Sequence, residues 1–243
     1  ETVEYLEDVK KKSEEIAKMQ NGLIYIMADL VESRDKSTGD HIKKTTAYVE
    51  LLLRKLKEKG YFTDILTDEY IYEVANSAPL HDVGKIKVSD LVLNKPGRLD
   101  NEEFEKMKMH TKEGGKIIEN AMKISSTSDY LKEAENIALY HHEKYDGSGY
   151  PFGLKGDEIP LSARIMAVSD VFDALVSARV YKPGMKFEDA MNIIKEGSGK
   201  HFDPIVAKVF VECEDEVRKI AEEHKKIYGE KSEEGKEDGE SQA

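Results

Sequence analysis

Apolar residues recur along most of this chain at steps of three, four and seven, which is the spacing of amphipathic helices. Tyr48, Leu51, Leu52 and Leu56 give one such helix its buried face. No segment combines a period of two with enrichment in β-branched residues, so we expect no sheet. The pattern predicts an all-α chain, with further helices over residues 64–80, 101–110, 117–122, 131–141, 160–179, 187–194 and 204–227.

The first segment, residues 1–20, is mostly polar but strongly helical in propensity. A narrow apolar seam runs along it, interrupted by Ser13 and Gln20. Both a short coiled coil or linker helix and a helix packed on the body fit this pattern. We expect a linker helix over residues 1–27, and a homodimer through it by analogy with signalling linkers. The seam residues are Leu6, Val9, Ile16 and Leu23.

The rest of the chain is long enough to bury a core without disulfides, and we expect one helical domain over residues 28–228. After Tyr228, Gly, Ser, Glu and Lys dominate without apolar periodicity. Residues 229–243 are therefore expected to form an acidic disordered tail. Because the chain begins with Glu1 rather than Met, we expect it to be part of a longer protein or a processed chain.

The net charge of -12 argues against a nucleic-acid duplex as partner, because proteins that bind duplexes concentrate Lys and Arg on one face. It leaves room for a small anionic ligand in a locally positive cleft. Residues 22–31 form the strongest apolar stretch, but they include Asp29 and are too short for a membrane span. Cys213 is the only cysteine, which excludes an intramolecular disulfide and a thiolate metal cluster and fits a cytoplasmic location.

Two adjacent histidines, His141 and His142, end an apolar helical run. Adjacent residues on a helix point about 100° apart and therefore rarely share one ligand. At a helix end, however, both can reach one large, highly charged centre. The sequence Asp-Gly-Ser-Gly-Tyr-Pro at residues 146–151 then turns the chain and places Tyr150 beside this pair. A surface loop with two solvated histidines is the alternative.

Two carboxylates, Asp82 and Asp170, lie among apolar neighbours that should be buried. A buried carboxylate costs several kcal/mol unless it is paired or bound to a cation. Any one such residue could be hydrogen-bonded in the core, but the sequence offers too few partner cations for all of them. A metal centre resolves the difficulty. Its nitrogen and oxygen ligands would be His41, His81, Asp82, His110, His141, His142 and Asp170.

This set exceeds the needs of one tetrahedral zinc ion. It suits two octahedral first-row ions bridged by a carboxylate, with iron or manganese favoured, and such a pair can hold a phosphoryl group. Lys85 follows Asp82 by three residues and can place a positive charge on a phosphate oxygen, unless it is simply solvated. Arg179 and Lys182 could clamp a second phosphate or cap a helix C-terminus.

The combined motifs resemble the HD-GYP family of bacterial cyclic di-GMP phosphodiesterases, over about residues 28–212. The resemblance implies an HD-superfamily helical bundle with a metal site in its core. It also implies hydrolysis of cyclic di-GMP to linear pGpG, GMP or both, by attack of a metal-bound hydroxide on phosphorus, and a regulatory domain upstream. The motifs are Thr38-Gly39-Asp40-His41, His81-Asp82, Gly84-Lys85, Asn94-Lys-Pro-Gly97, Met109-His110-Thr111, His141-His142-Glu143, Asp146-Gly-Ser-Gly-Tyr-Pro151, Ser169-Asp170-Val-Phe-Asp-Ala-Leu175 and Phe202-Asp-Pro204.

The resemblance also implies a role for each matching residue. Lys85 would contact the scissile phosphate, Tyr150 would shape the pocket, and Asp173 would orient a histidine ligand. Arg179 and Lys182 would hold the dinucleotide. The first metal would lie on His41, His81 and Asp170, the second on His110, His141 and His142, with Asp82 as the bridge.

Two departures and two alternatives accompany this resemblance. Some family members hold a third iron with a glutamate four residues before the first histidine; that position is Ser37 here, so we expect two metals. Val180 replaces a common proline. The substrate could instead be another cyclic dinucleotide or a nucleotide monophosphate. A non-catalytic module that binds a nucleotide or a partner protein is the other alternative, although no ligand is missing.

Overall fold

The computed structural model describes residues 2–35, 40–125, 129–177 and 184–223. Most of these residues lie in helices and none of them lies in a strand, so the all-α prediction is confirmed. Residues 214–223 also form a helix. The α-helices are α1 (Thr2–Glu32), α2 (His41–Glu58), α3 (Asp68–Ser77), α4 (Asp90–Leu93), α5 (Asn101–Ser125), α6 (Asp129–Tyr140), α7 (Leu161–Val176), α8 (Phe187–Glu196) and α9 (Pro204–Glu212). Short 3-10 turns are η1 (Ser33–Asp35), η2 (Ala78–Leu80), η3 (Val83–Lys87) and η4 (Gly156–Glu158).

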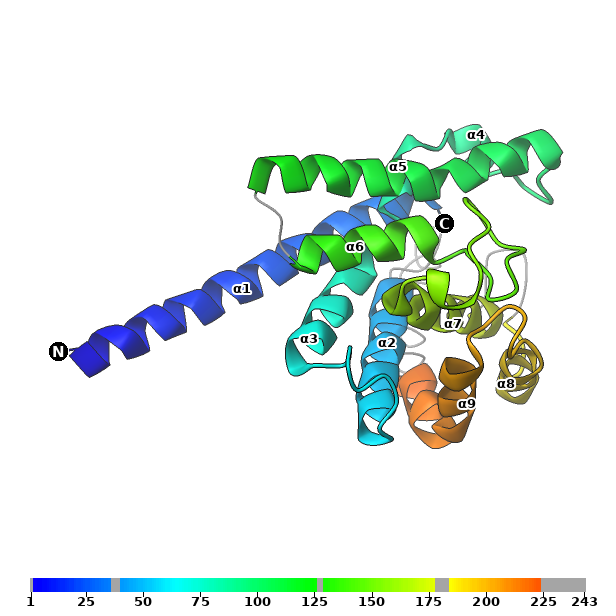
Figure 1. Cartoon of the computed structure of the whole chain (residues 1–243). Coiled ribbons are helices and arrows are strands. Elements are labelled where there is room, and N and C mark those ends of the chain that lie inside the picture. Colours follow the sequence, from blue (N-terminus) through cyan, green and yellow to red (C-terminus); the bar gives the residue numbers. More distant parts are fainter. Residues whose placement is uncertain (1, 36–39, 126–128, 178–183, 224–243) are drawn as a thin grey trace, which may run out of the picture.

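The main core surrounds α7, which is apolar around most of its circumference, as is typical of a buried helix. α7 packs against α2, α6, α8 and α9 (Figure 1). The Phe172 ring meets those of Tyr48 and Phe210 edge-on, with ring centroids 5.4 and 5.0 Å away. All three rings are fully buried. This packing fixes α2 and α7 relative to one another.

A second, smaller core lies under α5 and α6, which run side by side (Figure 1). α5 continues through Gly114 and Gly115 rather than ending there. A Cβ atom at Gly115 would overlap the Leu139 side chain of α6, so this glycine serves close helix packing. The buried residues of this core are Leu80, Val83, Ile118, Ala134 and Ala138.

Three predicted helices end differently in the structure. The helix expected over residues 64–80 is α3 followed by η2, because Pro79 lacks the amide hydrogen that would continue the ladder. The helix expected over residues 160–179 ends at Val176. The one expected over residues 204–227 is interrupted at Cys213. The predicted tail, residues 229–243, lies outside the described residues.

α1 runs without a break through residue 27, where the linker was expected to end. Its last turns pack on the body through Ile24, Ala28 and Val31, whereas its N-terminal half projects away (Figure 1). The division into linker, domain and tail stays a prediction, as does the pairing of two chains. Among the described helices, none combines the length and the apolar character that crossing a membrane requires.

Phe172→Ala should lower the free energy of unfolding by about 3–5 kcal/mol, because it opens a cavity where three buried rings meet. Urea denaturation followed by circular dichroism measures this change. Leu91→Ala is the control, since that side chain is 85% exposed and its removal should change stability by less than about 0.5 kcal/mol. Equal effects of the two substitutions would contradict the assignment of the core.

Candidate metal centre

The residues expected to bind metal come from helices of both cores and meet where the two cores join. The main core positions the ligands on α2 and α7, and the smaller core positions those on α5 and after α6. The connection between η2 and η3, which carries His81 and Asp82, lies between these two sets of ligands. In chain order the residues are His41 at the start of α2, His81 and Asp82 between η2 and η3, His110 in α5, His141 and His142 after α6, and Asp170 in α7.

Asp82 is shared by two groups of possible ligands. Its Oδ1 atom lies 3.3 Å from His110 Nε2 and 3.7 Å from His141 Nε2. Its Oδ2 atom lies 3.4 Å from His81 Nε2. A carboxylate placed in this way can bridge two ions. In each group the possible ligand atoms lie within 4.8 Å of one another. The first group consists of His41, His81 and Asp82, and the second of Asp82, His110, His141 and His142.

The local backbone holds three of these histidines in one orientation. The Nδ1 atoms of His81, His110 and His141 lie 2.7–3.0 Å from carbonyl oxygens three or four residues earlier. Because a carbonyl oxygen only accepts hydrogen bonds, Nδ1 carries the hydrogen and Nε2 presents its lone pair. Each of these Nε2 atoms is buried and makes no hydrogen bond within the described part of the chain. A metal ion would supply the missing partner.

The predicted contact between Asp173 and a histidine is present. His41 Nδ1 lies 2.6 Å from Asp173 Oδ2, and Lys44 Nζ pairs with Asp173 Oδ1 at 2.9 Å. This arrangement leaves His41 Nε2 facing Asp170 Oδ1 at 3.4 Å. Glu32, the last residue of α1, adds a carboxylate oxygen 3.8 Å from the same Nε2 atom. Sequence reasoning missed Glu32, because no motif marks it.

Protonation preferences differ between the two groups. Burial lowers the pKa of His110 to about 4 and lowers the pKa of His142 well below its usual value. Burial also opposes protonation of His41, but hydrogen bonds with Asp170 and Asp173 outweigh it and raise its pKa to about 10. Histidine binds metal as the neutral imidazole. A metal ion bound here would therefore meet neutral rings at His110 and His142, and would have to displace a proton at His41.

Lys85 is not a solvated lysine. Its side chain is only 17% exposed, and its Nζ atom lies 2.8 Å from Asp82 Oδ2 and 2.6 Å from Asp35 Oδ2. Burial opposes ionisation of Asp82, but the charge of Lys85 favours the carboxylate, and the pKa of that carboxyl lies well below its usual range. The ammonium group is thus held at the carboxylate that both ligand groups share.

Arg34 ties the Lys85 segment to the end of α1. Its guanidinium donates to the carbonyl oxygens of Lys85 and Ile86 at 3.3 and 2.9 Å and pairs with the Asp90 carboxylate at 2.8 Å. Sequence reasoning missed both Arg34 and Asp35. Their partners lie 50 or more residues away along the chain, so no local pattern reveals these contacts.

The glycine-rich turn forms a wall beside the second ligand group. The Tyr150 ring stacks on the His142 imidazole with centroids 4.9 Å apart. Glu143, which the motif included without a role, is buried and accepts hydrogen bonds at 2.7–3.1 Å from the backbone amides of residues 152–154. Glu143 therefore anchors the turn that carries Tyr150. Arg179, Lys182, Ser37 and Val180 lie outside the described residues, so the expectations for them stay predictions.

Backbone contact between η3 and α5 sets the position of Asp82 relative to His110. A Cβ atom at Gly84 would overlap the carbonyl oxygen of His110 and the backbone nitrogen of Gly114. Only glycine permits this approach. The glycine between Asp82 and Lys85 is therefore a requirement of packing at the centre.

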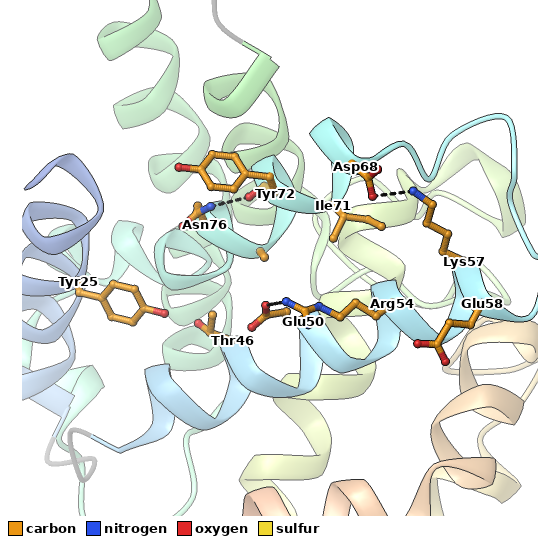
Figure 2. Close-up of a pocket in the computed structure, with 11 residues that line it drawn as sticks. Tyr25, Thr46, Glu50, Arg54, Lys57, Glu58, Asp68, Ile71, Tyr72 and Asn76 are labelled. Carbon is orange, nitrogen blue, oxygen red and sulfur yellow. Dashed lines mark hydrogen bonds and ion pairs between the residues drawn. The ribbon is translucent and has the colours of Figure 1, made fainter. Parts of the chain in front are cut away.

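A cavity of about 740 Å³ lies elsewhere, between α1, α2 and α3 (Figure 2). Tyr25, Thr46 and Tyr72 line it, together with an ion pair in which Lys57 Nζ lies 2.7 Å from Asp68 Oδ1. None of the residues expected to bind metal or substrate lines this cavity. It is therefore separate from the centre around Asp82.

Comparison with known proteins identifies relatives. The family described as HD domain matches residues 25–206. A probable cyclic di-GMP phosphodiesterase of Vibrio cholerae is 45% identical over 210 residues, which is 86% of this chain and 48% of that protein. A 3'3'-cGAMP-specific phosphodiesterase of the same organism is 36% identical over 216 residues, which is 89% of this chain and 38% of that protein. The chain thus spans about half of these relatives or less.

The fold also matches a solved structure. A HDG"Y"P protein from Bdellovibrio bacteriovorus superposes with a TM-score of 0.53 at 22% identity, covering 73% of this chain and 53% of that one. This likeness concerns the fold alone. It agrees with the helical bundle expected from the sequence.

Gly84→Ala should separate η3 from α5, lower the free energy of unfolding by at least about 1–3 kcal/mol and reduce the metal content of the purified protein. Thermal unfolding and elemental analysis measure both effects. Gly22→Ala makes the same chemical change in α1, where a Cβ atom meets nothing within 4 Å, so it should be neutral or stabilising by up to about 1 kcal/mol. If Gly84→Ala behaves like Gly22→Ala, the close approach is not needed.

Proposed function

This chain belongs to the HD-domain family, and on that premise we propose that it is a metal-dependent phosphodiesterase that hydrolyses cyclic di-GMP at the centre around Asp82. The family match confirms the resemblance drawn from the motifs. The observation that carries the proposal is the shared carboxylate, with two groups of ligands on its two oxygen atoms. The phosphodiesterases among the relatives support the reaction class.

Two metal ions are part of the proposal. The donor set contains nitrogen and oxygen atoms and no sulfur, which favours iron or manganese. The buried Nε2 atoms without hydrogen bonds fit such ions. When bound, the ions would neutralise charge on phosphoryl oxygens and lower the pKa of water. One would be held by His41, His81 and Asp170, the other by His110, His141 and His142, with Asp82 between them.

The protein's own residues would then bind and orient the dinucleotide. Lys85 Nζ, held between Asp82 and Asp35, would donate to an oxygen of the scissile phosphate and stabilise its developing charge. Tyr150, stacked on His142, would bound the pocket. Arg179 and Lys182 would hold the rest of the dinucleotide. The turn anchored by Glu143 would keep Tyr150 in place.

The relatives are longer than this chain, which supports an upstream regulatory domain in the full-length protein. We propose a cytoplasmic location because the chain has a single cysteine and so no intramolecular disulfide. The cGAMP-specific relative makes 3'3'-cGAMP the competing substrate. The products, linear pGpG or GMP, depend on whether the second bond is also cut.

The proposal is tested by anaerobic purification, elemental analysis and turnover of cyclic di-GMP and 3'3'-cGAMP, with products separated by chromatography. We expect two iron or manganese ions per chain and faster hydrolysis of cyclic di-GMP. Asp82→Asn should lose metal and lower the rate at least about 100-fold, because the bridge is removed. Asp189→Asn, an exposed carboxylate on α8, is the matched control. Full metal content without turnover of either nucleotide would overturn the proposed reaction.

Lys85→Met should retain metal but lower kcat about 100-fold, because a charge that stabilises the phosphoryl oxygens is lost. Steady-state kinetics and elemental analysis on one preparation separate the two effects. Lys87→Met removes an exposed lysine of the same turn and should leave the rate unchanged. If Lys85→Met keeps the wild-type rate, Lys85 has no role in the reaction.

A further inference from the structure

Beside the metal centre, α5 and the glycine-rich turn expose a group of aromatic rings. Phe104 on α5 is 46% exposed, and Phe152 in the turn is 55% exposed. Tyr150 connects them to the centre, because its ring stacks on His142 and meets the Phe104 ring edge-on with centroids 6.1 Å apart. Exposed apolar groups that gather at one place mark a binding surface. We call the rings of Phe104, Tyr150 and Phe152 the aromatic shelf.

Lysine ammonium groups lie over the aromatic shelf. Lys108 follows Phe104 by one turn of α5, and its Nζ atom lies 5.3 Å from the Phe104 centroid and 5.7 Å from the Tyr150 centroid. Lys112 follows one turn later, with its Nζ atom 5.4 Å from the Phe152 centroid. Such distances are typical of cation–π contacts. The shelf therefore combines flat apolar surface with positive charge.

Lys108 keeps hydrogen atoms that a ligand can accept. Its side chain is partly buried, and its Nζ atom pairs with Glu105 Oε1 at 2.6 Å. The Glu105 side chain is exposed, so water screens this ion pair and its contribution to stability is small. An ammonium group has three hydrogen atoms, and a single oxygen acceptor occupies one of them. Two remain for a ligand lying on the shelf.

The part of the shelf that lies on the turn is restrained by two contacts. The backbone amide of Phe152 donates to Glu143 Oε1 at 2.7 Å. The Phe152 ring also packs against the ring of Tyr140, the last residue of α6, with centroids 5.8 Å apart. The turn and α5 thus hold their rings on the same side of the metal centre as His142.

A guanine base is the ligand that this combination suits best. Every nucleobase has a flat face that stacks on aromatic rings. Guanine presents two acceptors on one edge, O6 and N7, whereas adenine presents one acceptor and a donor amino group there. Because an ammonium group donates and cannot accept, Lys108 favours guanine. The position suits a nucleotide as well, since Tyr150 joins the shelf to a residue of the metal centre.

We propose that the aromatic shelf binds a guanine base of the substrate, which stacks on Phe104 while Lys108 Nζ donates to its O6 or N7 atom. This inference rests on the proposed function, because it takes the centre around Asp82 to hold the phosphate of the same nucleotide. It goes further by naming the base that is recognised and the two residues that select it. Phe104 and Lys108 bind the base and take no part in the reaction at phosphorus.

Binding of mononucleotides tests the shelf without any turnover. GMP and AMP share ribose and phosphate and contain no phosphodiester bond, so isothermal titration calorimetry of the metal-containing protein compares the two bases. The wild-type chain should bind GMP more tightly than AMP. Phe104→Leu keeps an apolar side chain but removes the ring, and it should weaken GMP binding about 10-fold. Lys108→Met should also weaken GMP binding about 10-fold, with much less effect on AMP.

Two control variants match these substitutions. Tyr72→Leu removes an exposed ring that lines the separate cavity, and Lys106→Met removes an exposed lysine of α5 that pairs with Glu102 at 2.7 Å. Both should bind GMP as the wild type does, and all four variants should keep their helical content and their metal. A wild type that does not prefer GMP would overturn the inference. So would a Phe104→Leu variant with wild-type affinity for GMP.

Turnover of cyclic di-GMP separates this inference from the proposed reaction. If both hold, Phe104→Leu should raise KM about 10-fold and leave kcat nearly unchanged. If cyclic di-GMP is not hydrolysed but GMP binding depends on Phe104 and Lys108, the base site stands and the proposed reaction fails. If cyclic di-GMP is hydrolysed with a KM that neither substitution changes, the reaction stands and the base site is overturned.

Discussion

The Asp82 carboxylate lies between two groups of histidine side chains and beside the Lys85 ammonium group, and this placement constrains the structure around it. A largely buried carboxylate that loses one partner costs about 3–5 kcal/mol. Lys85 Nζ pairs with Oδ2 at 2.8 Å, whereas Oδ1 makes no hydrogen bond within the described residues and faces the lone pairs of His110 and His141, an arrangement that a bound cation would stabilise. This arrangement requires the helices of two separately packed cores to bring their histidine and aspartate side chains to the same point.

The neighbouring features serve that convergence. Gly84 lets the backbone after Asp82 touch α5 beside His110, and backbone carbonyl groups fix which nitrogen of each buried histidine faces inward. Asp173 does the same for His41. Glu143 stiffens the turn that carries Tyr150. Each of these contacts restrains a side chain or a turn, so the atoms that would bind metal are held in place by the protein itself.

The sequence predicted the helical class and the set of residues that meet at the centre, because histidine and aspartate residues are conspicuous within otherwise apolar helical segments. It missed Arg34, Asp35 and Glu32, since they lie in a polar segment whose partners are distant along the chain. The role of Glu143 could not be predicted either. Its partners are three backbone amides, and backbone amides are the same whatever the side-chain sequence. The sequence predicted separate helices over residues 101–110 and 117–122, whereas α5 runs through Gly114 and Gly115, and Gly115 makes room for Leu139 of α6.

The central claim is that Asp82 joins two metal ions, and anomalous diffraction from crystals of the anaerobically prepared protein tests it most directly. Data collected on either side of the iron and manganese absorption edges locate and identify the ions. We expect two peaks about 3.5–4 Å apart, one beside each oxygen of Asp82. A single peak on one group of ligands, or peaks that do not flank Asp82, would contradict the claim.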